Sequence, residues 1–193
     1  MKLILGSESK KRKLLLEEAG IHIDEVLPAH VDEKSLRSED FFELPKILAR
    51  AKRDALLPQI QEPSFLITGD TVLFSEDILL EKPESADEER YFFSLYDGVR
   101  PFSFVTALTV TNTATGESVE GAEEGQALSG PYTKEFVEEY IKKGEYMYYA
   151  GGFTHHDPIF HNKFKFISGS AGALIGMPIE LVKELLAKVG YKS

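Results

Sequence analysis

Short apolar runs that alternate with helical patterns limit the folds open to this sequence more than any other feature. Leu3-Ile4-Leu5 and Phe65-Leu66-Ile67 are too short for helices and are typical of buried strands. Further β-rich or alternating runs cover residues 21–26, 72–80, 102–111 and 159–167. Amphipathic helical patterns cover residues 9–19, 42–57, 85–96, 133–144 and 178–190. The alternation predicts an α/β fold built on a mixed sheet with flanking helices.

Local chemistry predicts where several of these elements begin and end. Ser85, with Glu88 three residues later, forms a capping box, and Thr133 is a suitable N-cap for the helix that follows it. The second apolar run is expected to end at Gly69-Asp70-Thr71, where the chain would leave the sheet. The acidic segment at residues 117–124 is expected to be a loop.

Length and charge narrow the class of protein. A chain of 193 residues predicts one compact domain that spans residues 1–193. The 32 acidic residues exceed the 22 Lys and Arg residues, and the net charge of -10 argues against a nucleic-acid binder, which needs a basic surface. A small anionic substrate is compatible with this charge, because a few cations in one cleft can hold a phosphate.

Two absences in the composition exclude further classes. Without Cys the chain cannot form disulfides, thiolate metal sites or a cysteine nucleophile. Its apolar runs fall well short of the roughly 18–20 residues of a membrane-spanning helix, and the N-terminus lacks the apolar core of a signal peptide. We therefore expect a cytoplasmic protein with no membrane partner.

The junction between the first strand and the first helix is a candidate phosphate site. Ser7 and Ser9 supply hydroxyl groups, and residues 10–13 are four consecutive cations that include Lys11 and Arg12. Backbone N–H groups at a helix start, hydroxyls and cations together suit phosphate oxygens. The alternative is an N-cap followed by a solvated basic turn. The spacing alone does not choose between these two interpretations.

Single charged residues elsewhere are weaker candidates. Asp70 follows an apolar strand, where it could bind magnesium or orient a water, or could simply be a turn residue. Lys82 follows the hairpin at residues 72–80, where it could reach a phosphate or could lie exposed before a rigid turn. Glu33, in an acidic loop, and Lys52, on a helix, are ordinary surface residues when each is taken alone.

Three histidines close together raise the alternative of a transition-metal site. His155, His156 and His161 lie within seven residues of one another. However, adjacent side chains in an extended segment point to opposite faces, so His155 and His156 would not easily bind the same ion. A metal-binding protein is therefore kept as an alternative hypothesis, which zinc analysis of purified protein would test.

Taken in order, these segments resemble the Maf-like family of nucleoside triphosphate pyrophosphatases. The resemblance covers nearly the whole chain. The segments that carry it are Leu5-Gly6-Ser7-Glu8-Ser9-Lys10-Lys11-Arg12, Val31-Asp32-Glu33, Leu48-Ala49-Arg50-Ala51-Lys52, Asp70-Thr71-Val72, Glu81-Lys82-Pro83, Phe104-Val105-Thr106, Ala150-Gly151-Gly152-Phe153 and Ile175-Gly176-Met177-Pro178.

The resemblance implies a fold, a reaction and a set of site residues. The fold would be elongated, with two lobes around a central cleft. The reaction would be hydrolysis between the α and β phosphates of a nucleoside triphosphate, with Mg²⁺ or Mn²⁺, in a homodimer. Asp70 would be the general base or a metal-associated carboxylate, and Glu33 would help to hold the metal. The residues that would bind substrate are Ser7, Lys11, Arg12, Lys52, Thr71, Lys82 and His156.

Departures from the family pattern leave the base open. Lys10-Lys11 replaces Pro-Arg, and His156-Asp157 stands where the family has Gln-Gly or Glu-Gly, a position tied to base recognition. We expect a house-cleaning enzyme that acts on pyrimidine, non-standard or modified nucleotides. The alternatives are a 7-methyl-GTP-type pyrophosphatase and a non-catalytic nucleotide-binding protein linked to cell division control.

Overall fold

The computed structural model describes residues 1–154, 157–160 and 162–192. In this part of the chain, seven strands form one twisted sheet in the order β2-β1-β3-β5-β6-β7, and β4 pairs with the far end of β3. The first three strands run parallel, and β3, β5, β6 and β7 run antiparallel. The strands are β1 (Lys2–Leu5), β2 (Glu25–Val26), β3 (Ser64–Ser75), β4 (Ile78–Leu79), β5 (Phe102–Asn112), β6 (Glu117–Ser129) and β7 (Phe164–Ser168).

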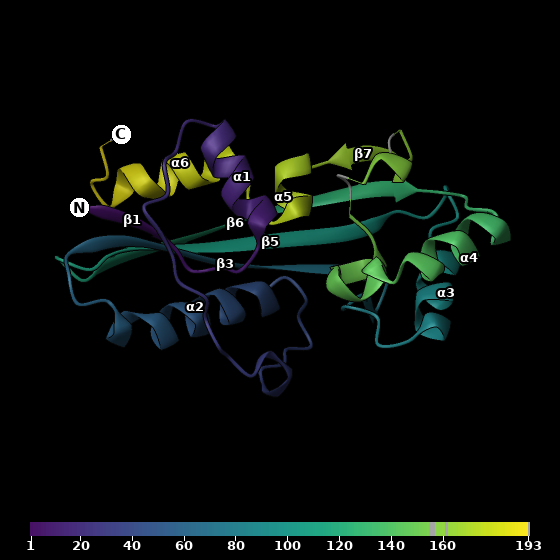
Figure 1. Ribbon diagram of the computed structural model, residues 1–193, viewed down its shortest axis with the longest axis horizontal. Coiled ribbons are helices and arrows are strands. Elements are labelled where there is room, and N and C mark those ends of the chain that lie inside the picture. Colours follow the sequence, from purple (N-terminus) through teal and green to yellow (C-terminus); the bar gives the residue numbers. More distant parts are fainter. Residues whose placement is uncertain (155–156, 161, 193) are drawn as a thin grey trace.

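Helices cover both faces of the sheet, so the expected α/β class with a mixed sheet is confirmed (Figure 1). Helix α2 lies along one face, and α1, α5 and α6 lie on the other, while α3 and α4 pack at one end of the long strands. The α-helices are α1 (Lys10–Glu18), α2 (Leu44–Leu56), α3 (Ala86–Leu95), α4 (Lys134–Lys143), α5 (Ala171–Ile175) and α6 (Ile179–Lys188). Short 3₁₀ turns occur at η1 (Glu33–Ser35), η2 (Leu57–Gln59), η3 (Glu145–Tyr148), η4 (Ala150–Gly152) and η5 (Pro158–Phe160).

The core is divided between the two ends of the long strands. At one end, β1, α1 and α6 bury aliphatic side chains such as Leu3, Leu16 and Leu185. At the other end, α3 and α4 enclose a mainly aromatic cluster that includes Phe93 and Phe160. The molecule is elongated, because β3, β5 and β6 run through both regions (Figure 1). This division agrees with the expectation of two lobes.

Helix caps form where local chemistry predicts them. The hydroxyl groups of Ser9, Ser85 and Thr133 accept hydrogen bonds from backbone N–H groups in the first turns of α1, α3 and α4. Gly144 ends α4 with φ of 72°, a conformation that favours glycine because it has no Cβ. These signals act within four residues, so the sequence alone can predict them.

The structure corrects the strand boundaries that depend on distant partners. Residues 117–124 are not a loop: they form the first part of β6, where Gly121 packs against α6 and backbone pairing with β5 overrides the low strand propensity of Glu and Gly. The predicted strand at 21–26 is reduced to Glu25–Val26. The strand predicted at 159–167 begins only at Phe164, because Pro158 starts a 3₁₀ turn.

A further correction concerns Gly69-Asp70-Thr71. This segment does not end a strand but lies in the middle of β3, which continues to Ser75. Pairing with β5 holds the segment in the sheet, since Asp70 lies opposite Ala107 and Thr71 opposite Thr106. The turn chemistry of Gly and Asp is therefore overruled by a long-range ladder.

Within the described residues, no helix is both long enough and apolar enough to cross a membrane.

Close packing across β6 generates a test of the fold. A Cβ added at Gly125 would overlap the Phe104 ring and would lie 2.7 Å from the Ser168 carbonyl oxygen. We expect Gly125→Ala to lower the free energy of unfolding by about 1–3 kcal/mol, because the core and a backbone atom must shift. Urea denaturation measures the loss.

Gly121→Ala is the matched control on the same strand. There the added Cβ would lie 2.7 Å from Leu181 Cδ1, the end of a flexible side chain that can move away. We expect a smaller loss of stability, and equal losses at the two positions would contradict the packing described for β6.

Candidate active site

The candidate site forms where β3 continues beyond its parallel neighbour. The last residue of β1, Leu5, pairs with Ile67, and β4 pairs with β3 only from Phe74. Among the described residues, no strand covers this edge of β3 over residues 68–73, which we call the uncovered stretch. The end of β1 leads through residues 6–9 into α1, so the N-terminus of a helix follows the strand that stops at this edge.

Asp70 lies in the uncovered stretch and faces α2. Its Oδ1 atom is 2.5 Å from Lys52 Nζ, and both side chains are almost buried, at 13% and 12% exposed. The same Lys52 ammonium is 2.7 Å from Oε1 of Glu33, whose side chain is half exposed. Thus Lys52 lies between two carboxylates that are far apart in the sequence.

Burial raises the pKa of the Asp70 carboxyl, while Lys52 and Arg12 partly oppose this by stabilising the charged form. Burial also lowers the pKa of the Arg12 guanidinium, which nevertheless keeps its charge at neutral pH. An aspartate that is poised by opposing effects inside a set of cations is a common feature of catalytic sites.

Arg12 reaches the same stretch of β3 from α1. Its guanidinium donates to the Gly69 carbonyl oxygen at 2.8 Å, to Thr71 Oγ1 at 3.1 Å and to Ser7 Oγ at 3.4 Å. Thr71 in turn contacts Thr106 Oγ1 at 2.7 Å, and Thr106 donates to the Ala173 carbonyl oxygen at 2.6 Å. Because Thr106 uses its proton on that carbonyl, Thr71 must donate to Thr106 and accept from Arg12.

Consecutive strand residues point to opposite faces, and this explains how the site is divided. Asp70 contacts Lys52 on the α2 side, whereas Thr71 contacts Arg12 and Thr106 on the side of α1 and α5. A ligand that lies across the uncovered stretch can therefore meet both groups.

Lys11 links α1 to the chain segment before β7. Its ammonium donates to Thr154 Oγ1 and lies 4.3 Å from the centre of the Tyr149 ring. Burial lowers the pKa of Lys11, and Asp157 and Glu145 oppose the shift. Lys11, which precedes Arg12 in α1, therefore connects this helix to the segment that contains Thr154.

Two other expected substrate-binding residues, Lys82 and His156, have no described contact with Asp70, Lys52 or Arg12. Lys82 is exposed and forms no ion pair within the described residues, whereas Arg12 and Lys52 both contact the middle of β3, from its two faces. His156 lies outside the described residues. The same is true of His155 and His161, so the histidine metal site stays a prediction.

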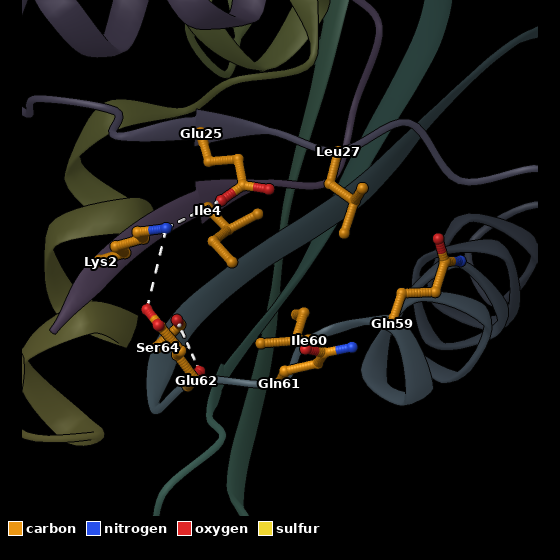
Figure 2. A pocket seen from close by; sticks show the side chains of 9 residues that line it. All are labelled: Lys2, Ile4, Glu25, Leu27, Gln59, Ile60, Gln61, Glu62 and Ser64. Carbon is orange, nitrogen blue, oxygen red and sulfur yellow. Dashed lines mark hydrogen bonds and ion pairs between the residues drawn. The ribbon is translucent and has the colours of Figure 1, made fainter.

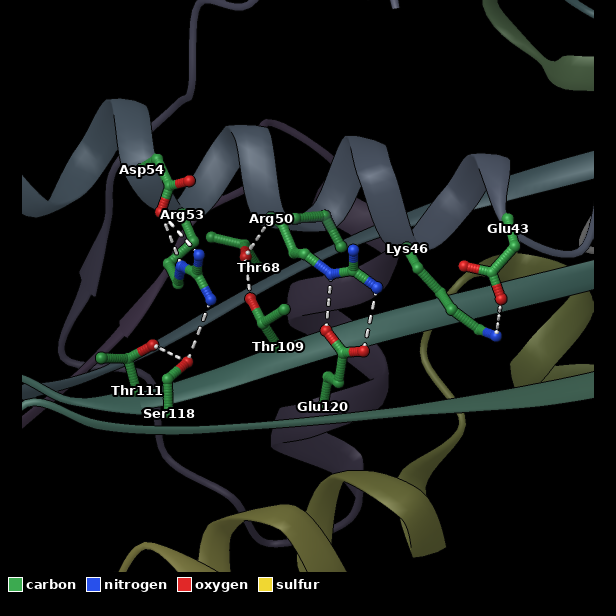
Figure 3. A network of polar contacts seen from close by, with 11 residues as sticks. Glu43, Lys46, Arg50, Arg53, Asp54, Thr68, Thr109, Thr111, Ser118 and Glu120 are labelled. Atoms are coloured by element: carbon green, nitrogen blue, oxygen red, sulfur yellow. Dashed lines mark hydrogen bonds and ion pairs between the residues drawn. The ribbon is translucent and has the colours of Figure 1, made fainter. Parts of the chain in front are cut away.

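Helix α2 is held on the sheet by polar contacts on its other side (Figure 3). Arg50 forms a two-bond ion pair with Glu120 of β6 at 2.7 and 3.0 Å, and Arg53 donates to Ser118 at 3.3 Å. In the interior, Thr68 donates to the Ala49 carbonyl oxygen. These contacts fix the rotation of α2 and so direct Lys52 at Asp70.

A surface pocket at the opposite end of β1 is separate from this site (Figure 2). It is lined by Ile4, Leu27, Ile60 and polar side chains, and the Lys2 ammonium is 3.5 Å from Glu25 and 3.9 Å from Glu62. With its one cation already paired, the pocket offers no chemistry comparable to that around Asp70.

Two residues of the site were not among the predicted site residues. Thr106 is fully buried and orients Thr71, and Gly176 has a φ of 93° at the end of α5, where a Cβ would lie 2.5 Å from Thr71 Oγ1 and 2.6 Å from Arg12 Nη2. They belong to the segments Phe104-Val105-Thr106 and Ile175-Gly176-Met177-Pro178, which contribute to the family resemblance. Their roles depend on tertiary contacts that spacing does not show.

The donor set around Lys52 suits a hard divalent cation. The carboxylates of Asp70 and Glu33 already converge on one positive charge, the Lys52 ammonium. Within the described residues, no group of three or more His, Asp or Glu side chains could hold a metal by itself. Two carboxylates completed by substrate oxygens is the arrangement that Mg²⁺ commonly adopts.

Comparison with known proteins places the chain among nucleotide hydrolases in sequence. The family model described as Maf-like protein matches residues 2–189. A Dictyostelium discoideum protein named 7-methyl-GTP pyrophosphatase is 33% identical and covers 97% of this chain and 96% of its own length. A dTTP/UTP pyrophosphatase of Chelativorans sp. is 31% identical, over 100% and 93%. Among solved structures, a HAM1 protein from Coxiella burnetii gives a TM-score of 0.48 at 13% identity, over 97% and 99% of the two chains.

The contact between Lys52 and Asp70 predicts a change in titration. Lys52→Met removes the nearest cation from Asp70, so the charged form loses its main support and the pKa of Asp70 rises further above its ordinary value of 3.8. Carboxyl ¹³C NMR over a pH series measures this change.

Arg53→Met is the matched control on the same helix. The Arg53 side chain contacts Asp54 and Ser118 instead of Asp70, so the pKa of Asp70 should be unchanged. If Lys52→Met left that pKa where it was, the contact would be refuted.

Proposed function

Because the chain belongs to the Maf-like protein family, we propose that it hydrolyses a nucleoside triphosphate to the monophosphate and pyrophosphate at the site around Asp70. The chain is a nucleoside triphosphate pyrophosphatase, because relatives that are named for this activity align with it over nearly the full length.

One observation carries the assignment of the site. Lys52 lies between the carboxylates of Asp70 and Glu33, beside a stretch of strand edge that Arg12 approaches from the other face. Phosphoryl-transfer chemistry needs positioning and charge neutralisation more than covalent chemistry. A set of separated cations with one buried carboxylate meets those needs.

We assign triphosphate binding to the N-terminus of α1 and to the cations around it. Arg12 offers a planar pair of donors, and Ser7 and the first N–H groups of α1 lie on the same side of β3. Lys52 would exchange its contacts with Asp70 and Glu33 for phosphate oxygens. Lys82 is exposed and has no ion-pair partner among the described residues. Its side chain could therefore move to contact the phosphates as a single positive charge.

Asp70 would accept the proton of the attacking water. Its raised pKa makes the carboxylate a stronger base than an exposed aspartate, while Lys52 and Arg12 favour its ionised form. The water oxygen forms a bond to phosphorus, the bond between the α and β phosphates breaks, and pyrophosphate leaves with the electron pair. Lys52 and Arg12 would stabilise the negative charge that the leaving group gains.

We further propose that Asp70 and Glu33 hold Mg²⁺, or Mn²⁺, together with the substrate. When bound, the metal would neutralise charge on the phosphate oxygens. A carboxylate has two oxygens, so Asp70 can share in holding the ion and still accept a proton. Glu33 is half exposed and can adjust its position as Lys52 moves away.

The base is proposed as a pyrimidine or a modified purine. Relatives of similar identity are named for dTTP and UTP and for 7-methyl-GTP, so identity alone does not separate these substrates. Thr71, which accepts a hydrogen bond from Arg12, is among the residues proposed to bind substrate, and His156 lies outside the described residues.

The proposed function predicts the products and the catalytic residue. With Mg²⁺ and a panel of dTTP, UTP, 7-methyl-GTP and GTP, we expect at least one triphosphate to yield monophosphate and pyrophosphate, and chelation of the metal to stop the reaction. Asp70→Asn should lower kcat/KM by about 100-fold or more, because a general base contributes roughly 10²–10⁴ in rate. Ion chromatography of the products measures both effects.

Asp77→Asn is the control, since Asp77 is an exposed turn residue on the same hairpin as Asp70. It should leave kcat/KM unchanged. Release of orthophosphate instead of pyrophosphate would contradict the reaction, and full activity of Asp70→Asn would contradict the role of that residue. Tight binding without turnover would favour the non-catalytic alternative.

A further inference from the structure

Glu89 is a carboxyl group that the mechanism does not use and that has no obvious reason to be inside the protein. It lies in α3 and is 0% exposed, and neither of its side-chain oxygens has a hydrogen-bond partner among the described residues. Burial raises the pKa of Glu89 to about 9, and the neighbouring charge of Glu88 adds to the shift. At neutral pH the group is therefore the uncharged acid.

The group that Glu89 touches is a double glycine. A Cβ on Gly152 would overlap the Glu89 carboxyl, so the carboxyl packs directly on the Gly152 backbone. Gly151 and Gly152 have φ of 70° and 78°, a conformation that favours glycine. The hydroxyl of Tyr96 at the end of α3 donates to the Gly151 carbonyl oxygen at 2.9 Å. Glu89 and Tyr96 thus both contact the double glycine, Glu89 at Gly152 and Tyr96 at Gly151.

The double glycine is joined to two candidate substrate cations. The Gly151 N–H group donates to the carbonyl oxygens of Leu80 and Glu81, both at 3.0 Å, and Lys82 is the next residue. Thr154, two residues after Gly152, accepts a hydrogen bond from Lys11. A shift of this short segment would therefore move Lys11 and Lys82 together.

Among the described residues, the ionisable groups around Glu89 contain no cation that could balance a negative charge. Glu88 is its neighbour on α3, and the hydroxyls of Tyr96 and of Tyr140 on α4 are close enough for the charge of Glu89 to raise their pKa values. The Tyr140 hydroxyl also has no hydrogen-bond partner in the described chain. Ionised Glu89 would be an unpaired charge beneath the double glycine, which is costly in a low dielectric.

We propose that Glu89, as the neutral acid, is a positioning residue of the substrate site: it supports the Gly151–Gly152 segment and so places Lys11 and Lys82, and its ionisation releases that segment. This inference rests on the proposed function, and it adds to that function a residue far from the reacting atoms. The carboxyl acts through the backbone that it touches and makes no contact with substrate.

The test compares Glu89→Gln, which keeps the shape but cannot ionise, with wild type and with Glu89→Ala. At pH 7 Glu89→Gln should match wild type, and Glu89→Ala should raise KM more than it lowers kcat, because the binding cations lose their support. Between pH 8 and about pH 10, wild type should lose about tenfold in kcat/KM relative to Glu89→Gln, since one pH unit above a pKa leaves about a tenth of a group protonated.

Ionisation of lysines or of the base affects both proteins equally, so the ratio of their kcat/KM values isolates Glu89. Asp87→Asn, which alters a fully exposed acid on the same helix, should follow the wild-type profile. A ratio of Glu89→Gln to wild type that stays constant from pH 7 to pH 10 would overturn the proposal. So would a folded Glu89→Ala variant with unchanged KM.

A second measurement does not depend on activity. Glu89 ionises near its ordinary value of 4.5 in the unfolded chain but only near 9 in the folded one, so the unfolded state binds fewer protons between these values. Wild type must then lose stability relative to Glu89→Gln as the pH rises from 5 to 9. Thermal unfolding should show a Tm advantage of Glu89→Gln that is larger at pH 8.5 than at pH 5.

The two measurements separate the possible failures. If no variant hydrolyses any triphosphate but the Tm advantage grows with pH, the proposed function fails while the buried neutral acid is supported. A Tm advantage that does not change with pH would overturn the inference even in an active enzyme.

Discussion

The difference in length between β1 and β3 is the constraint on which the rest of the site depends. β1 has four residues and β3 has twelve, so the edge of β3 between Ile67, where β1 ends, and Phe74, where β4 begins to pair, lacks a strand neighbour within the described chain. That gap lets Arg12 bond the Gly69 carbonyl, and it leaves Asp70 and Thr71 on opposite faces of an accessible edge. A longer β1 would instead pair with this edge of β3 and occupy its backbone groups.

Two cations, Arg12 and Lys52, lie at this gap although the protein has a net charge of -10. Many acids pair with cations on the surface, as Glu120 does with Arg50. Lys52 is different, because it is nearly buried and forms ion pairs with two carboxylates, Glu33 and Asp70. A buried ion pair is weak evidence for stability, since desolvation offsets much of the attraction. Its value here lies in holding a cation where phosphate oxygens and a divalent metal would compete for the same partners.

Local signals predicted most of the fold, and long-range contacts account for what they missed. Ser9 and Thr133 cap helices because a hydroxyl reaches an N–H group three residues away. Gly69-Asp70-Thr71 has the composition of a turn, yet pairing with β5 keeps it in a strand, so Asp70 lies beyond the end of β1 and not beyond the end of its own strand. The burial of Glu89 could not be predicted from the sequence, because an acidic residue near the start of α3 is typical of an exposed helix face.

The central claim is that Asp70 and Glu33 can exchange the Lys52 ammonium for a divalent cation when a triphosphate binds. The most direct measurement is the electron paramagnetic resonance spectrum of Mn²⁺ with a triphosphate whose α–β bridging oxygen is replaced by methylene. We predict that wild type broadens the Mn²⁺ signal only with the analogue present, and that the double variant Glu33→Gln, Asp70→Asn abolishes the effect. The same broadening in the double variant would contradict the account.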